Sequence, residues 1–121
     1  MSRFTHAFVL LLITGIAVGQ QPACQRNNFG LFEDINCAVA ALQAADRELN
    51  ATYARLLTLL APREASALRK AQRAWLEFVK ADARFTEDRE GDGSAGRLIV
   101  TNNRERQTRE RTLELKSWIA R

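Results

Sequence analysis

The sequence predicts an all-α protein, a small antiparallel bundle of three helices with a disulfide-closed loop at its N-terminal end. Three segments have helical periodicity, with rows of residues at spacings of 3 and 4 that correspond to one helix face. Valine, isoleucine and threonine nowhere alternate over enough residues to indicate a strand. With 121 residues, 46% of them apolar and 26% charged, the chain has the size and composition of one globular domain.

The first 19 residues have the features of a signal peptide. Arg3 makes the start positive, and an apolar run follows over residues 7–18, which is shorter than the roughly 20 residues that span a bilayer. Small residues at Ala17 and Gly19 are typical of a signal-peptidase site. We therefore expect cleavage after Gly19 and a single periplasmic or secreted domain over residues 20–121, with no stable membrane anchor. A retained anchor is the alternative.

The two cysteines, Cys24 and Cys37, are expected to form a disulfide, because an isolated pair in a small exported domain usually oxidises. The loop between them contains Asn27, Asn28 and Gly30, which tolerate tight turns. Closing a loop of this size stabilises the fold by about 3 kcal/mol in the chain-entropy model. Two free thiols, or a lipid attached to Cys24, are the alternatives.

The first helix is expected over residues 36–60, and Pro62 marks its end or the first turn of the next helix. The apolar stripe of this first helix has the spacing of a single face: Leu42, Ala45, Leu49, Tyr53, Leu56 and Leu60.

The second helix is expected over residues 63–85. Its stripe has the same spacing: Leu68, Ala71, Trp75, Phe78, Asp82 and Phe85. Asp82 is the polar member of this stripe and needs a partner if it is buried. Residues 87–96 follow with three glycines and four acidic residues, a composition that predicts a flexible acidic surface loop.

The third helix is expected over residues 97–120. Its inward row is apolar at the ends and polar in the middle: Leu98, Thr101, Glu105, Thr108, Thr112, Leu115 and Ile119. Such a row indicates a helix that is less buried, or one that makes polar contacts with the other two helices.

The composition argues against an enzyme. The single histidine, His6, lies in the expected signal peptide, so the mature chain has no imidazole for Ser-His, Cys-His or His-metal chemistry. Two cysteines cannot supply a four-ligand zinc site, and we predict no catalytic residue, metal or cofactor. After Gly19 the chain carries 17 basic and 14 acidic residues, a net +3 that is interleaved along the helices. A nucleic-acid partner is not expected, because its binding would call for a cleaner basic stripe with aromatic residues.

Several short motifs in this order resemble a known family. They are Ala45-Asp46, Leu49-Asn50 and Tyr53, then Leu68, Ala71-Gln72-Arg73-Ala74-Trp75 and Phe78, then Gly93-Ser94, Thr108, Arg111 and Leu115. Residues 37–115 are thereby similar to the small exported bacterial family whose namesake is the mycobacterial lysozyme inhibitor LprI. The resemblance implies an all-helical exported domain and, for some members, binding to lysozyme that blocks cell-wall hydrolysis. It also implies a second disulfide, whose positions Ala83 and Asn103 occupy here.

The shared residues divide into a predicted core and a predicted polar cluster. The core residues are Leu49, Tyr53, Trp75, Phe78 and Leu115. The polar residues are Asp46, Asn50, Gln72, Arg73, Asp82, Thr108 and Arg111. We expect the polar cluster to tie the helices together, with Arg111 paired to Asp46 or Asp82. The functional alternative is that this cluster binds a ligand or a partner.

Two functions are consistent with the sequence. The first is an exported inhibitor with a protein partner, a lysozyme-type glycosidase that cleaves peptidoglycan. Many lysozymes are cationic, so the expected contact is the acidic segment with Glu87, Asp88, Glu90 and Asp92, and the next candidates are Arg104 and Arg106. The alternative is a non-inhibitory envelope protein that binds an anionic surface polymer or another protein partner, and steep salt dependence would mark binding to a polyanion.

Overall fold

The structure, a computed structural model, describes Cys24 and residues 30–121, and the expected signal peptide lies outside the described residues. Three helices make up this part of the chain: α1 (Leu31–Leu59), α2 (Pro62–Glu90) and α3 (Ser94–Ile119). No strand occurs in the described ranges, so the expected all-α bundle is confirmed. None of the described helices is long and apolar enough to cross a membrane.

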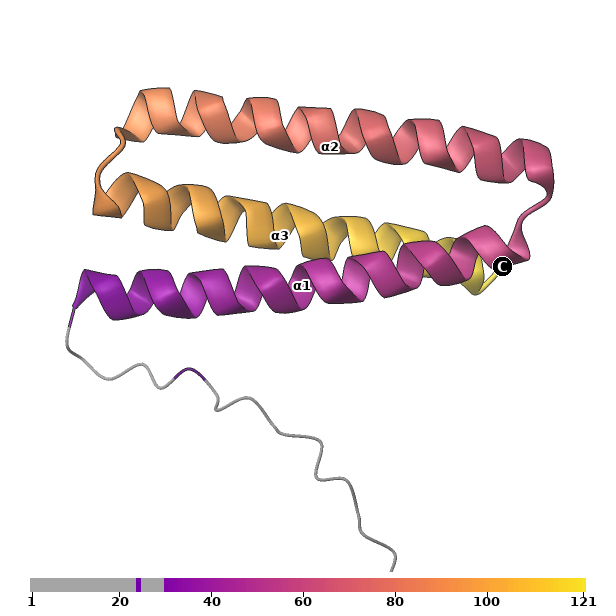
Figure 1. The fold of residues 1–121 in the computed structure, drawn as a ribbon, viewed down its shortest axis with the longest axis horizontal. Helices are drawn as coiled ribbons and strands as arrows, with labels where there is room; N and C mark the ends of the chain where they lie inside the picture. The colour runs from indigo at the N-terminus through magenta and orange to yellow at the C-terminus, as the bar shows by residue number, and fades with distance from the viewer. Residues whose placement is uncertain (1–23, 25–29) are drawn as a thin grey trace, which may run out of the picture.

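The last helix in the sequence is the central helix in space (Figure 1). α3 packs extensively along α1 and less extensively along α2, whereas α1 and α2 scarcely contact each other. Short connections make consecutive helices antiparallel, so α1 and α3 run in the same direction. The apolar core forms between α1 and α3 from Leu49, Leu56 and Leu115, each at most 3% exposed.

The first helix follows the predicted stripe. Ala45, Leu49 and Leu56 are buried, and Tyr53 and Leu60 pack against the core with part of their surface exposed. Pro62 is the first residue of α2, where its missing N–H costs no helical hydrogen bond. The N–H of Ala61 donates to Glu64 Oε2 at 3.0 Å, which caps this helix start.

The buried face of α2 differs from the predicted one. Phe78 is 57% exposed, so its assignment to the core is wrong, and Phe85, expected on the same stripe, is 66% exposed. The buried residues of α2 are Ala65, Gln72, Val79 and Thr86. This face was missed because it carries polar side chains, which α3 accommodates with polar side chains of its own. Hydrophobicity therefore does not mark the contact between α2 and α3.

The expected acidic loop is mostly helix. α2 continues to Glu90, and only residues 91–93 connect it to α3. Gly91 ends α2 with φ +84°, a conformation that favours glycine, and its N–H donates to the carbonyl of Glu87 at 2.8 Å. Gly96 is buried so closely against Gly91 that a β-carbon would overlap the Gly91 carbonyl oxygen. The connection is a tight turn, and the prediction of a flexible loop is wrong.

The predicted disulfide between Cys24 and Cys37 is present, with the two Cα atoms 5.4 Å apart. It attaches the segment before α1 to the second turn of that helix. The bond consumes the Cys24 thiol that a lipid would need, so it excludes both alternatives for these cysteines. Disulfides of this kind are typical of proteins outside the cytosol.

Candidate functional site

A groove of about 470 Å³ lies between α1 and α2, with α3 beneath it, and we call it the central groove. It exists because α1 and α2 are separated by α3 along most of their length. Its buried base consists of Leu49, Gln72, Val79 and Thr108. Five members of the predicted polar cluster line it: Asp46, Asn50, Gln72, Arg73 and Thr108. The structure therefore gathers most of that cluster around one cavity.

Gln72 is held in one orientation by Arg111. The guanidinium Nε of Arg111 donates to Gln72 Oε1 at 3.0 Å, and its Nη1 donates to Glu114 Oε2 at 2.6 Å. Because Arg111 can only donate, the amide oxygen of Gln72 must face it. The Gln72 amide nitrogen is then left without an acceptor among the described residues, although the residue is only 8% exposed. This nitrogen is accessible to solvent, so it can donate a hydrogen bond to a ligand at the base of the groove.

Three arginines stand at the exposed rim of the groove: Arg69 and Arg73 from α2, and Arg104 from α3. None of them makes an ion pair or a side-chain hydrogen bond within the described part of the chain. With the single carboxylate of Asp46, the lining has a formal charge of +2. The groove is therefore rich in hydrogen-bond donors and attracts anions.

Other basic residues of α3 are neutralised by acidic neighbours. Arg106 pairs with Glu110 at 2.9 Å, and Arg109 pairs with Glu105, whose carboxylate raises the pKa of the Arg109 guanidinium. On the α1 side, Lys116 donates to Glu48 at 2.5 Å and thereby lowers the pKa of that carboxyl.

Two aromatic residues of the family motif, Tyr53 and Trp75, form the wall of the groove. Tyr53 and Trp75 are partly buried, because one part of each side chain packs against the core cluster while the residue also lines the cavity. Leu76 extends this wall and is exposed. Leu115, in contrast, lies within the core and does not line the groove.

Two expected pairings are replaced by others. Arg111 binds Gln72 and Glu114, so its predicted pairing with Asp46 or Asp82 is wrong. Asp82 does have a partner, because Gln107 Nε2 donates to its Oδ2 at 2.7 Å. No apolar pattern indicates this contact in the sequence, because both partners are polar.

The predicted partner-binding residues lie in different places. Glu87, Asp88 and Glu90 are on the last turns of α2, and Asp92 is in the turn; we call these four residues the acidic tip. All are exposed, at the end of the bundle where α1 begins (Figure 1). Arg104 is at the groove, whereas Arg106 lies outside it, in its ion pair.

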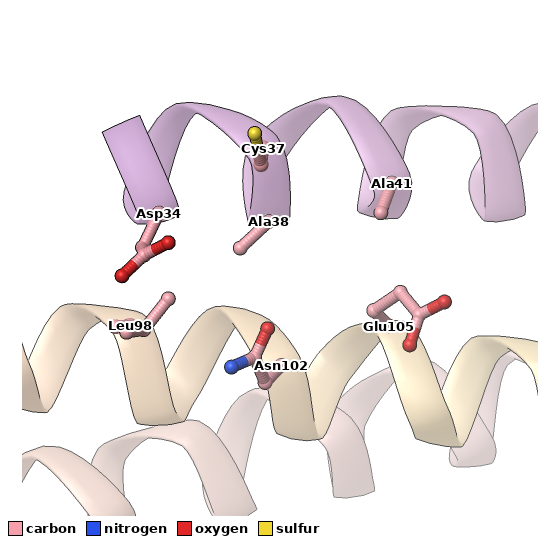
Figure 2. A pocket seen from close by; sticks show the side chains of 7 residues that line it. All are labelled: Asp34, Cys37, Ala38, Ala41, Leu98, Asn102 and Glu105. Carbon is pink, nitrogen blue, oxygen red and sulfur yellow. The ribbon is translucent and has the colours of Figure 1, made fainter. Parts of the chain in front are cut away.

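A second hollow of about 470 Å³ separates the first turns of α1 from α3. Figure 2 shows Asp34 and Glu105 at its two ends, with Asn102 between them and small side chains above. The described residues contain no cluster of three His, Cys, Asp or Glu side chains that would hold a metal. The central groove is the better candidate site, because it combines a buried donor with unpaired charges.

Arg69 and Leu76 are groove residues that the sequence interpretation missed. With Arg73 they have the spacing 69, 73, 76, which places all three on one face of α2. That pattern of two arginines and one apolar residue was the available signal for a basic, partly apolar surface.

Comparisons with known proteins agree with this description. The chain is 30% identical over 125 residues to the uncharacterized protein R02472 of Rhizobium meliloti (strain 1021), covering 92% of this chain and 90% of that protein. No solved structure matches it significantly. The family model for lysozyme inhibitor LprI matches residues 24–115, which include α1, α2, most of α3, the disulfide and the groove-lining motifs. The chain therefore belongs to the lysozyme inhibitor LprI family.

Proposed function

We propose that the protein is exported after removal of residues 1–19, and that its domain, residues 20–121, binds and blocks a lysozyme-type enzyme that cleaves peptidoglycan. The observation that carries this proposal is the family match over residues 24–115. The Cys24–Cys37 disulfide supports the export step, because such bonds persist in oxidising compartments.

The acidic tip is the surface that best suits a cationic lysozyme. Its four carboxylates are exposed at one end of the bundle, at and beside the turn between α2 and α3 (Figure 1). The turn that contains Asp92 and follows the other three is held by the Gly91 cap and by the close packing of Gly96. A preorganised contact loses little conformational entropy on binding, and its charge accelerates association with a positive partner.

The alternative of an anionic surface polymer is less well supported by the charge arrangement. A polymer binder needs a continuous basic surface, but Arg106, Arg109, Arg111 and Lys116 of α3 are each engaged by a carboxylate. Arg104 is unpaired in the described structure, and it lies at the exposed rim of the central groove.

The test is a cell-wall lysis assay with the purified, oxidised mature protein and several lysozymes. Inhibition of at least one lysozyme is expected. A variant with Glu90→Gln and Asp92→Asn should inhibit about tenfold more weakly, since two rim ion pairs contribute up to about 1 kcal/mol each. The loss should appear mainly as slower association and should shrink at high salt.

A matched control removes two acidic charges elsewhere, with Glu77→Gln and Glu110→Gln. Both residues are exposed and distant in sequence from the acidic tip. This control should inhibit as well as the wild type. Equal weakening of the two variants would show a general charge effect and remove the tip from the interface, and failure to inhibit any lysozyme would contradict the proposed function.

A further inference from the structure

We propose that the central groove binds an acidic sugar, a ring-shaped ligand that carries both a carboxylate and hydroxyl groups. This goes beyond the proposed function, because it concerns a small ligand at a surface other than the acidic tip and does not require a lysozyme.

The anionic part of the ligand follows from the donors of the groove. The buried Gln72 amide nitrogen has no acceptor within the described structure, and the guanidinium groups of Arg73 and Arg104 are unpaired beside it. A carboxylate accepts several such hydrogen bonds at once, and arginine matches its planar geometry. The Arg111 contact fixes the direction of the Gln72 amide before any ligand arrives.

The hydroxyl groups of the ligand follow from Asp46. This partly buried carboxylate also lines the groove, without a hydrogen-bond partner among the described residues. An inorganic anion such as phosphate would be repelled by it, but a sugar hydroxyl donates to it. The ligand must therefore combine an anionic group with neutral donors.

The ring follows from the wall and the size of the groove. Trp75 and Tyr53 present aromatic side chains, and Leu76 adds an apolar edge, surfaces against which the C–H face of a sugar ring packs. A volume of about 470 Å³ lies in the range of small-molecule sites. The combination of donors, one acceptor and aromatic wall is that of a site for a polar ring.

The experiment is a titration of isotope-labelled mature protein, followed by NMR, with N-acetylmuramic acid as the probe. N-acetylglucosamine serves as the matched neutral sugar, because it lacks the lactyl carboxylate, and inorganic phosphate serves as the bare anion. Shifts confined to residues around the groove are expected with the acidic sugar. Binding of the neutral sugar or of phosphate should be at least about tenfold weaker, the loss expected when one charge-assisted hydrogen bond is missing.

Two arginines on the same helix provide matched variants. Arg104→Gln should weaken binding of the acidic sugar about tenfold, whereas Arg106→Gln, outside the groove, should leave it unchanged. Gln72→Glu keeps an acceptor for Arg111 and preserves the fold, but it replaces the donor by a carboxylate and should abolish binding. The amide spectrum of each variant verifies that it is folded.

Several results would overturn the inference. These are no groove shifts with N-acetylmuramic acid, equal binding of the neutral sugar or of phosphate, or equal loss in the Arg104 and Arg106 variants. If no sugar binds and Arg104→Gln abolishes lysozyme inhibition, the groove belongs to the protein interface and the sugar proposal fails. Sugar binding without any inhibition would support this inference while contradicting the proposed function.

Discussion

Replacing Gly96 by alanine should destabilise the protein through the turn between α2 and α3. A β-carbon at this position would overlap the Gly91 carbonyl oxygen and lie 3.0 Å from the Gly91 carbonyl carbon and 3.3 Å from the Glu90 oxygen. These neighbours are backbone atoms, which cannot rotate away, so the helix ends must separate. Overpacking of this kind costs about 3 kcal/mol at the upper end of its range, and alanine regains about 1 kcal/mol of helix propensity over glycine.

The expected net loss is therefore about 2 kcal/mol in the free energy of unfolding. For a domain of about 100 residues this lowers the melting temperature by about 8–16 °C. Urea and thermal unfolding followed by far-UV circular dichroism measure both quantities. Gly93→Ser is the control, because a β-carbon there meets nothing within 4 Å and serine suits a helix N-cap. A Gly96→Ala protein that melts at or above the wild-type temperature would refute this account of the turn.

Two further predictions concern polar contacts of α3. Asp82→Ala should lower the free energy of unfolding by about 2 kcal/mol, because it leaves the amide nitrogen of buried Gln107 without an acceptor. The double variant Asp82→Leu with Gln107→Leu should be neutral or stabilising, because it also removes the Gln107 amide oxygen, which already lacks a partner in the described structure. Urea unfolding measures both variants, and a double variant that loses as much stability as the two single substitutions together would contradict this prediction. Since Lys116 lowers the pKa of Glu48 from 4.5, the stabilisation from this pair is complete above pH 4.5 and disappears as the pH falls through the lowered pKa. In Glu48→Gln, the free energy of unfolding should fall less steeply below pH 4.5 than in the wild type when both are measured at low salt. An unchanged dependence on pH would contradict this prediction.

The sequence was most informative where burial is apolar. The stripe of α1, with Leu49 and Leu56, has a helical repeat and is also the observed core. On α2 the apolar residues Phe78 and Phe85 share a helical repeat as well, but they are exposed, and the face toward α3 includes Gln72 and Thr86. Hydrogen bonds rather than hydrophobicity select that face, so periodicity alone could not identify it.

The turn and the groove depend on information that is not local. Three glycines and four acids suggested a loop, yet Glu87 and Glu90 are good helix formers, and the helix ends only at the glycine with positive φ. The motif residues around the groove were recognisable from the resemblance. Their gathering around a cavity could not be predicted, because it depends on α1 and α2 being held apart by α3.

The central place of the last helix also determines when the chain can fold. α1 and α2 scarcely contact each other, so a chain that contains only these two helices has almost no helix–helix interface to stabilise it. Leu49 and Leu56 obtain their packing partner, Leu115, only when the C-terminal segment arrives. The apolar core of the described bundle therefore forms only once α3 is present. Chains truncated before α3 would keep these leucines exposed and become substrates for proteases.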